Sequence, residues 1–285
     1  MSKHILFFLF FYFVSVNLHA NEARQYVFKN DPIDVVIVSH PKDKPTIDLC
    51  IDGIRNNCKV NRIIVVSPKK LTDKAEWFHE NKYPFSKEDV AFQIGREDQK
   101  KTDTFFKHGH PPGWYYQQLL KLYAAYVIPS ISSNVLIIDA DSVFMNPVKF
   151  LGESFAGLLC TSRNRTTKGH YVDHASRLIP NYKRVNPNLN SVHHHMLFQK
   201  AILDDLFADV EKKHGLPFWK AFCRCIDLSR KGASEYEIYY NYALTYCKDV
   251  KLRALKRRSS GKISKIPDYK KDGYHMVSFH SYMRK

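Results

Sequence analysis

The sequence predicts an α/β fold built on a largely parallel sheet. Three runs rich in β-branched residues, at 33–39, 61–67 and 134–139, are typical of buried strands. A stretch with helical periodicity at 46–57 follows the first of these runs, and another at 114–127 precedes the last of them. Strands that alternate with helices favour parallel pairing and place ligands at the carboxyl ends of the strands.

The composition is that of a globular protein. Of the 285 residues, 44% are hydrophobic and 25% are charged. These values exclude a disordered chain, a collagen and a multi-pass membrane protein. One large domain or two small ones would fit this length. We expect residues 21–285 to form a single domain that ends in a basic segment.

The first twenty residues have the pattern of a signal peptide or signal anchor. Lys3 precedes an apolar run at 5–16, and Ala20 could close a cleavage site. The run is shorter than the roughly 20 residues of a membrane-spanning helix. Leu18 is larger than a signal peptidase prefers, so an uncleaved anchor stays open. We expect export or membrane anchoring, into the secretory lumen if the source is eukaryotic, with cytoplasmic exposure as the alternative.

Basic residues are concentrated at the end of the chain. The whole sequence has 44 Lys and Arg against 28 Asp and Glu, and residues 248–285 have twelve against three. Such a segment suits phosphate-bearing ligands or an anionic membrane surface. We expect a phosphorylated or lipid-linked acceptor or membrane-surface association and no nucleic acid, with a merely solvated basic surface as the alternative.

Four further segments complete the expected order of elements. Residues 90–94 predict a weaker third strand, and residues 100–113 predict a polar loop. Residues 201–210 predict a helix, as do residues 235–247. The six cysteines are an even number, which permits disulfide bonds in an exported chain, and their spacing does not match a zinc module.

Polar residues gather where the predicted elements end. His40 and Asp43 follow the first strand and are candidates for substrate contacts, although neither a G-x-G-x-x-G fingerprint nor a P-loop occurs in the sequence. On the helix at 114–127, one face carries four polar or amphipathic residues at i, i+3, i+4 and i+7. They are Trp114, Gln117, Gln118 and Lys121. A solvated helix edge is the alternative interpretation of that face.

Two carboxylates lie at the end of the strand at 134–139. Asp139 and Asp141 are one residue apart, directly after an apolar run. Mg²⁺ and Mn²⁺ prefer such oxygen ligands, with water and substrate phosphate in the other positions. A turn in which Asp139 bonds backbone amides would explain one carboxylate well and two less well.

Several motifs, in this order, resemble a family of predicted sugar transferases with the GT-A fold. They are 113–121 (GWYYQQLLK), 137–144 (IIDADSVF), 194–198 (HHMLF), 217–219 (PFW), 233–239 (ASEYEIY) and 277–281 (VSFHS). The resemblance spans roughly residues 33–283. It implies a GT-A-like, Rossmann-like mixed sheet flanked by helices. It also implies transfer of a sugar from a nucleoside-diphosphate donor to a hydroxyl acceptor.

The resemblance also implies roles for individual residues. Asp141 would bind Mn²⁺ or Mg²⁺ directly, and Asp139 would contact the donor ribose or the metal through water. His280 is the expected further metal ligand, with His275 in reserve and a structural role as the alternative.

Further substrate contacts are expected from the 114–121 helix face and from the three consecutive histidines. Lys121, Gln117 and Gln118 would contact the donor phosphate or sugar. Of the histidines at 193–195, alternation along a strand puts the first and third on one face, and we expect His195 to line the acceptor pocket. An adventitious surface metal, or no role, is the alternative for these histidines.

Glu235 is the candidate catalytic base, because an inverting transferase needs a carboxylate to deprotonate the acceptor. It follows Ser234 at the start of a predicted helix, where the helix dipole alone would favour an acidic residue. Ser234 and Glu237 have the spacing of a capping box, which would account for Glu237 on structural grounds.

Two other function classes stay open. The sequence from Asp139 also resembles the start of a haloacid-dehalogenase phosphatase motif, which uses its first Asp as nucleophile and a later acidic pair. The adjacent Asp204 and Asp205 lie in a predicted helix and not at a strand end. The second alternative is a non-catalytic, secreted polyanion-binding protein, which would use the basic end of the chain.

Overall fold

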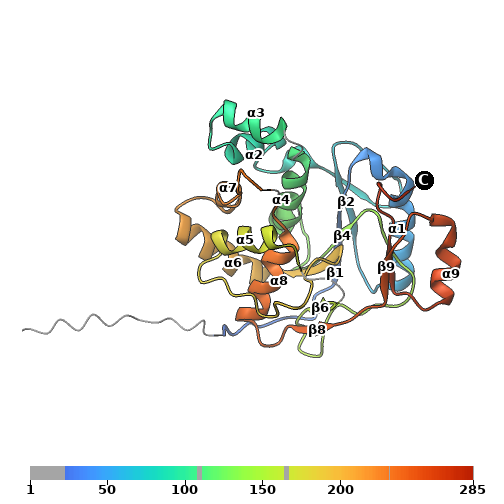
Figure 1. Cartoon of the computed structure of the whole chain (residues 1–285). Coiled ribbons are helices and arrows are strands. Elements are labelled where there is room, and N and C mark those ends of the chain that lie inside the picture. The colour runs from blue at the N-terminus through green and yellow to red at the C-terminus, as the bar shows by residue number, and fades with distance from the viewer. Residues whose placement is uncertain (1–22, 108–110, 164–166, 231, 285) are drawn as a thin grey trace, which may run out of the picture.

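The computed structural model describes residues 23–107, 111–163, 167–230 and 232–284. The predicted signal segment at 1–20 lies outside these residues. A five-stranded sheet has the order β3-β2-β1-β4-β7 (Figure 1). Its strands are β1 (Ile33–Val38), β2 (Ile63–Ser67), β3 (Glu76–His79), β4 (Asn134–Asp139) and β7 (His195–Gln199). The first four are parallel, and β7 runs antiparallel to β4. The predicted class, an α/β mixed sheet flanked by helices, is confirmed.

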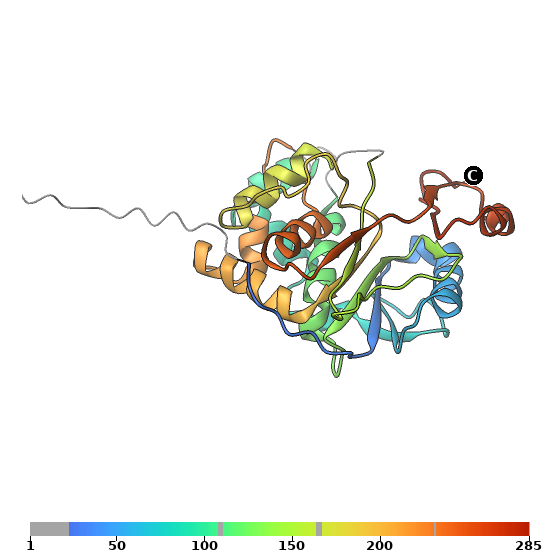
Figure 2. The same ribbon diagram turned by 90° about the horizontal axis from the view of Figure 1, so that it is seen from below.

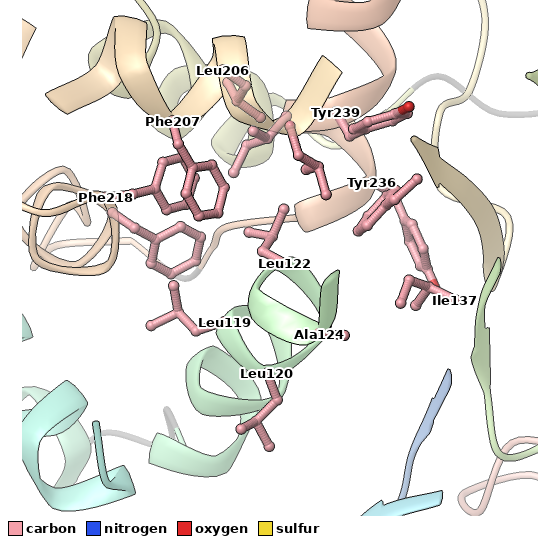
Figure 3. Packing of buried hydrophobic residues seen from close by; sticks show 14 of the residues in the cluster. Leu119, Leu120, Leu122, Ala124, Ile137, Leu206, Phe207, Phe218, Tyr236 and Tyr239 are labelled. Atoms are coloured by element: carbon pink, nitrogen blue, oxygen red, sulfur yellow. The ribbon is translucent and has the colours of Figure 1, made fainter. Parts of the chain in front are cut away.

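Helices cover both faces of this sheet because its strands are apolar on both sides. Val35 and Ile37 pack with α1 (Lys44–Asn57) in one buried cluster. Val36 and Val38 pack in a larger cluster on the other face, with α4 (Pro112–Val127), α6 (Lys200–His214) and α8 (Glu235–Tyr246). Figure 3 shows part of that second cluster, in which α4 and α8 side chains meet Ile137 of β4.

Shorter elements complete the fold. The remaining helices are α2 (Lys87–Ile94), α3 (Gln99–Lys107), α5 (Gly169–Leu178), α7 (Phe218–Arg224) and α9 (Ile266–Lys271), with single 3₁₀ turns η1 (Pro41–Asp43), η2 (Glu80–Lys82) and η3 (Ile263–Lys265). Two small sheets join β5 (Ser142–Phe144), β10 (Met276–Ser278) and β9 (Arg257–Ser259), and β6 (Leu158–Cys160) with β8 (Lys251–Arg253). Among the described residues, no helix has the length and apolar character that a membrane crossing requires.

Two predictions of secondary structure are wrong. Residues 90–94 belong to α2, whose start is fixed by a capping box between Ser86 and Asp89. The third strand is instead β3, which is only partly buried and therefore lacks a strong apolar pattern. The expected loop at 100–113 contains most of α3, which buries Phe105 against Tyr115 of α4.

The basic C-terminal segment packs on the α1 side of the main sheet. β10 pairs with β5, which follows the Asp139–Asp141 turn, and Val277 and Phe279 share a small buried cluster with Leu49 of α1. Figure 2 shows α9, in dark red, at the opposite end of the molecule from α5 and α6. All six cysteines lie within the described residues, and each is buried with a free thiol.

Candidate active site

The site lies at the carboxyl ends of β1 and β4, where the register pairs Val38 with Asp139. Asp139 accepts hydrogen bonds at Oδ1 from Lys121 Nζ (2.5 Å) and from the Tyr236 hydroxyl (3.0 Å). Its Oδ2 lies 2.9 Å from His194 Nδ1. Burial alone would raise the pKa of Asp139, but the Lys121 ammonium and His194 outweigh it and hold this pKa well below its usual range. Asp139 is therefore an anion with both oxygens engaged.

Lys121 joins two carboxylates. Its Nζ also lies 2.6 Å from Glu235 Oε1, and both side chains are almost fully buried, at 4% and 3% exposed. Burial would lower the pKa of Lys121, but Asp139 and Glu235 outweigh it and raise this pKa, so the ammonium stays protonated. Burial, together with the charge of Asp139, raises the pKa of Glu235 against the opposing effect of Lys121. Gln118 Oε1 accepts a hydrogen bond from the Glu235 backbone N–H (2.8 Å) and so fixes the start of α8.

Asp141 has a different environment. Its Oδ2 lies 3.0 Å from His280 Nδ1, whereas its Oδ1 is buried without a hydrogen-bond partner among the described residues. The Phe279 backbone N–H donates to the Asp141 carbonyl (2.7 Å), which holds the C-terminal strand against the turn. The ring of His280 lies 4.8 Å from that of His194, so both histidines are at the same edge of the carboxylate pair.

The unpartnered oxygen of Asp141 fits a cation. Burial raises the pKa of Asp43, and the charge of Asp141 adds to this shift, so the two carboxylates are close enough to repel each other. A divalent cation would relieve that repulsion and satisfy Asp141 Oδ1. The described residues contain no group of three or more His, Cys, Asp or Glu arranged to hold a metal, so water and substrate phosphate would have to complete its coordination. His280 already has contacts at Nδ1 with Asp141 and at Nε2 with Ser259.

The other residues expected near the first strand are at the same edge. His40 is exposed and caps η1, since its Nδ1 accepts a hydrogen bond from the Lys42 backbone N–H (3.3 Å). Its own backbone N–H donates to Asp43 Oδ2 (3.1 Å). Gln117 Nε2 donates to the carbonyl of Val38, the last residue of β1 (3.3 Å). Trp114 is 44% exposed and stacks on Tyr171 of α5, with ring centroids 6.4 Å apart. Tyr171 is itself buried, so Trp114 alone presents an exposed apolar face here.

The placement of His195 does not fit the predicted pocket role. Its ring is buried and packs edge-on against Phe144, 5.3 Å away, and burial lowers its pKa to about 3. His194 has a left-handed backbone, with φ of 63°, so β7 begins only at His195 and the expected alternation starts two residues late. His194, not His195, therefore reaches Asp139.

The predicted capping box is only half present. The Glu237 backbone N–H donates to Ser234 Oγ (3.4 Å), as expected of an N-cap. The Glu237 carboxylate, however, is fully buried and accepts hydrogen bonds from Tyr182 and Ser191. It links α8 to the segment before β7 and does not cap the helix.

Sequence reasoning missed three residues of the site. Tyr236 follows Glu235 directly in the motif at 233–239. The motif does not indicate that the Tyr236 hydroxyl donates a hydrogen bond to Asp139. His194 was hidden in a run of three histidines. Arg284, near the end of the chain, donates to Thr46 of α1 (3.3 Å), and its charge partly counters the raised pKa of Asp43. No local signal in the sequence predicts that contact, because 238 residues separate its partners.

The fold and the site define an α/β protein with an acidic centre at the carboxyl edge of its sheet. The chain belongs to DUF6492, a family of unknown function whose profile matches residues 31–258. No curated relative matches the sequence. The chain is similar to mouse xyloside xylosyltransferase 1 in its apo form, with 10% identity and a TM-score of 0.43 over 88% of this chain and 99% of that one. It is also similar to the apo bifunctional glycosyltransferase WbbM, with 13% identity and a TM-score of 0.42 over 91% of this chain and 47% of that one. Both likenesses are weak, and neither assigns an activity to this chain.

Proposed function

We propose that this protein is a metal-dependent, GT-A-like glycosyltransferase that moves a sugar from a nucleoside diphosphate to a hydroxyl acceptor. One observation carries the proposal: Asp141 Oδ1 is buried and unpartnered beside Asp43 and His280, at the carboxyl edge of a mostly parallel sheet. A site with excess negative charge and an unsatisfied oxygen suits Mn²⁺ or Mg²⁺ with a substrate phosphate. When bound, such a cation stabilises negative charge on a departing diphosphate.

The chain's own residues would orient the donor. Asp139 stays ionised and is held in place by Lys121, Tyr236 and His194. A carboxylate oxygen has two lone pairs, so Asp139 Oδ2 keeps acceptor capacity for a ribose hydroxyl or a water. Trp114 offers an apolar face to a sugar ring beside this centre.

Glu235 is proposed as the base. It would take the proton of the acceptor hydroxyl as the acceptor oxygen bonds to the anomeric carbon. The bond from that carbon to the donor phosphate breaks at the same time, and its electron pair leaves with the diphosphate. A carboxylate with a raised pKa is suited to accept this proton. Glu235 is 3% exposed, so its side chain must turn outward when the acceptor binds.

A matched substitution separates this role from a structural one. Glu235→Gln keeps the size of the side chain and removes the base. If Glu235 is the base, the transfer rate falls by about 10²-fold or more while donor binding stays within a few-fold of the native value. Loss of donor binding together with rate would assign Glu235 to the support of Lys121 and Asp139 instead.

The activity can be tested without knowing the acceptor. The full chain is incubated with a panel of nucleotide-sugars, with and without Mn²⁺. The release of nucleoside diphosphate is measured while the sugar is transferred to water or to added glycans. We expect release from one donor class only when the metal is present, and its loss in Asp141→Asn. Asp48→Asn, on the exposed side of α1, is the control. Metal-independent turnover, or full activity in Asp141→Asn, would contradict the proposal.

The geometry gives less support to the other two function classes. A phosphatase of this kind would need a later acidic pair at a strand end. Asp204 and Asp205 lie in α6, where they bond Tyr126 and Tyr26. A polyanion-binding protein would have no use for the paired carboxylates. A phosphoaspartyl adduct trapped on Asp139 would favour the phosphatase, and metal-independent polyanion binding without turnover would favour the binding protein.

The cellular location is part of the proposal. Lys3 and the apolar run at 5–16 favour export or anchoring of the domain, where the basic C-terminal segment could meet an anionic membrane surface. Fractionation of cells that express the full chain, with and without residues 2–20, tests this. Equal recovery of both forms in the cytoplasm would contradict it.

A further inference from the structure

A pocket of about 710 Å³ lies within the C-terminal segment, and neither Asp139 nor Asp141 lines it. Its walls come from the end of β9, the loop that follows it, η3 and α9. Six charged side chains line it, four of them basic: Arg258, Lys262, Lys265, Lys271, Asp268 and Asp272. The volume is within the range of about 300–1,000 Å³ that is usual for small-molecule sites. The excess of basic over acidic groups makes it attractive to anions.

The basic groups have no acidic partners of their own. Among the described residues, no carboxylate lies within 4.0 Å of the charged nitrogens of Lys262, Lys265 or Lys271, and none lies this close to Arg258. The Arg258 guanidinium instead lies over the rings of Tyr269 (4.9 Å) and Tyr274 (5.5 Å). Cation–π contact with two rings restrains the guanidinium without using its N–H groups, which suits a phosphate.

The pocket adjoins the carboxylate centre without being part of it. Ser259, on its wall, has its Oγ 3.2 Å from His280 Nε2, and His280 Nδ1 bonds Asp141. The C-terminal tail closes one side: a Cβ on Gly261 would lie 1.8 Å from the Met283 carbonyl oxygen, so only glycine permits this approach. The tail and the loop after β9 therefore pack together at one side of the pocket.

We propose that this pocket binds a phosphate-bearing group by itself, without a metal. Arg258 supplies oriented donors, and the three lysines supply mobile positive charge around them. The phosphate could belong to a soluble phosphoester or to the headgroup of an anionic lipid, since both present the same oxygens. The proposal does not depend on sugar transfer, because it needs none of Asp139, Asp141 or Glu235.

The test uses the full chain in EDTA and compares two variants with the same loss of charge. Lys262→Gln with Lys265→Gln removes two pocket lysines, and Lys248→Gln with Lys270→Gln removes two exposed lysines outside it. Inorganic pyrophosphate is the soluble probe, measured by calorimetry. We expect the pocket variant to bind at least about tenfold more weakly than the native chain, and the control within about threefold, because only the pocket lysines would donate charge-assisted hydrogen bonds to the phosphate oxygens.

Vesicles of phosphatidylcholine, with and without phosphatidic acid, form the second arm. Selective loss of binding to the acidic vesicles in the pocket variant would assign the site to lipid headgroups, whereas selective loss of pyrophosphate binding alone would assign it to soluble phosphoesters. Equal losses in both variants would overturn the proposal, since they would show a diffuse charge effect. Pyrophosphate binding that appears only with Mn²⁺ would also overturn it, by placing the anion at Asp141, and would leave the proposed transferase untouched.

Discussion

Lys121 is the residue on which the buried part of the site depends. One ammonium lies within 2.6 Å of carboxylate oxygens from both Asp139 and Glu235, in a region almost closed to solvent. Isolated buried charges are costly, and such a group is tolerated because the partners satisfy each other. The same arrangement holds the end of β4 and the start of α8 at a fixed separation, which any chemistry between them requires.

Removing this cation should destabilise the protein strongly. Lys121→Met leaves two buried carboxylates without their shared partner, and we expect the free energy of unfolding to fall by about 3–5 kcal/mol. In Lys121→Met with Glu235→Leu, part of the loss should return, because only Asp139 then lacks the ammonium and it keeps Tyr236 and His194. Urea unfolding of the full chain measures both. A loss in the double variant that equals the sum of the losses in Lys121→Met and in Glu235→Leu would show that the two charges are not coupled.

At the residue scale, sequence reasoning found the residue types better than their partners. Resemblance placed Asp139, Asp141, His280 and Glu235 in one site, and the structure brings them together. It assigned Lys121 to the donor phosphate, whereas Lys121 is buried between carboxylates. Which charged side chains pair with each other depends on their positions in three dimensions. The spacing of residues along one helix cannot predict these positions.

At the scale of elements, α1 and β5 pack closely because the residue of α1 at their contact is a glycine, which has no side chain. Gly53 lies in the buried face of α1, and a Cβ there would be 2.7 Å from the Phe144 carbonyl oxygen of β5. β5 in turn pairs with β10, which ends next to His280. The close approach of α1 therefore fixes the strand that positions the second carboxylate and its histidine.

Gly53→Ala should therefore destabilise the fold. Elsewhere in a helix, alanine in place of glycine is favourable by about 0.5–1 kcal/mol, but here the new methyl must push β5 away, and we expect a net loss of about 1–3 kcal/mol. Gly113→Ala in the first turn of α4 is the matched control, since nothing lies within 4 Å of its Cβ position. Thermal unfolding compares them, and an equal or higher midpoint for Gly53→Ala than for Gly113→Ala would contradict the packing described.

Element prediction succeeded where hydrophobic pattern and context agree. β1 and β2 are buried over their whole length and β4 over all but its last residue, so their β-branched runs are unambiguous. The prediction of a strand at 90–94 was wrong because a short apolar run fits either a strand or a helix. The N-cap at Ser86 favours the helix. β3 has two exposed residues out of four and gave no signal.

At the scale of the whole molecule, the protein buries neutral histidines in its packed layers. His174 of α5 is fully buried, its Nε2 is 2.9 Å from the Phe222 carbonyl, and its Nδ1 has no partner among the described residues. Burial lowers the pKa of His174 to about 4. A proton added at Nδ1 would place an unpaired charge between α5 and α7.

Stability should therefore fall in mild acid. The folded pKa of about 4 lies below the ordinary value of 6.5, so between these pH values the unfolded chain binds more protons than the folded one. The free energy of unfolding should decrease as pH drops from about 6.5 to 4, with His174 responsible for up to about 3 kcal/mol. Urea unfolding at several pH values, with His174→Gln and the half-exposed His79→Gln as control, measures this. An unchanged pH slope in His174→Gln would contradict it.

The arrangement of the whole chain was the least predictable part. The alternation of strands and helices is local, so the α/β class followed from it. The return of the C-terminal segment onto α1 depends on β5 pairing with β10, more than 130 residues later, and on contacts such as Arg284 with Thr46. Nothing in the local pattern of either partner specifies the other, so the pocket within this segment could not be predicted either.

The central claim is that Asp141 holds a cation that in turn binds a diphosphate. Calorimetry with nucleoside diphosphates, in the presence of Mn²⁺ and then in EDTA, tests it on the native chain, Asp141→Asn and the Asp48→Asn control. We expect Mn²⁺-dependent binding of the nucleoside diphosphate in the native chain and in the control. In Asp141→Asn, this binding should be at least about tenfold weaker. Binding that is equally strong in Asp141→Asn, or unaffected by EDTA, would contradict it.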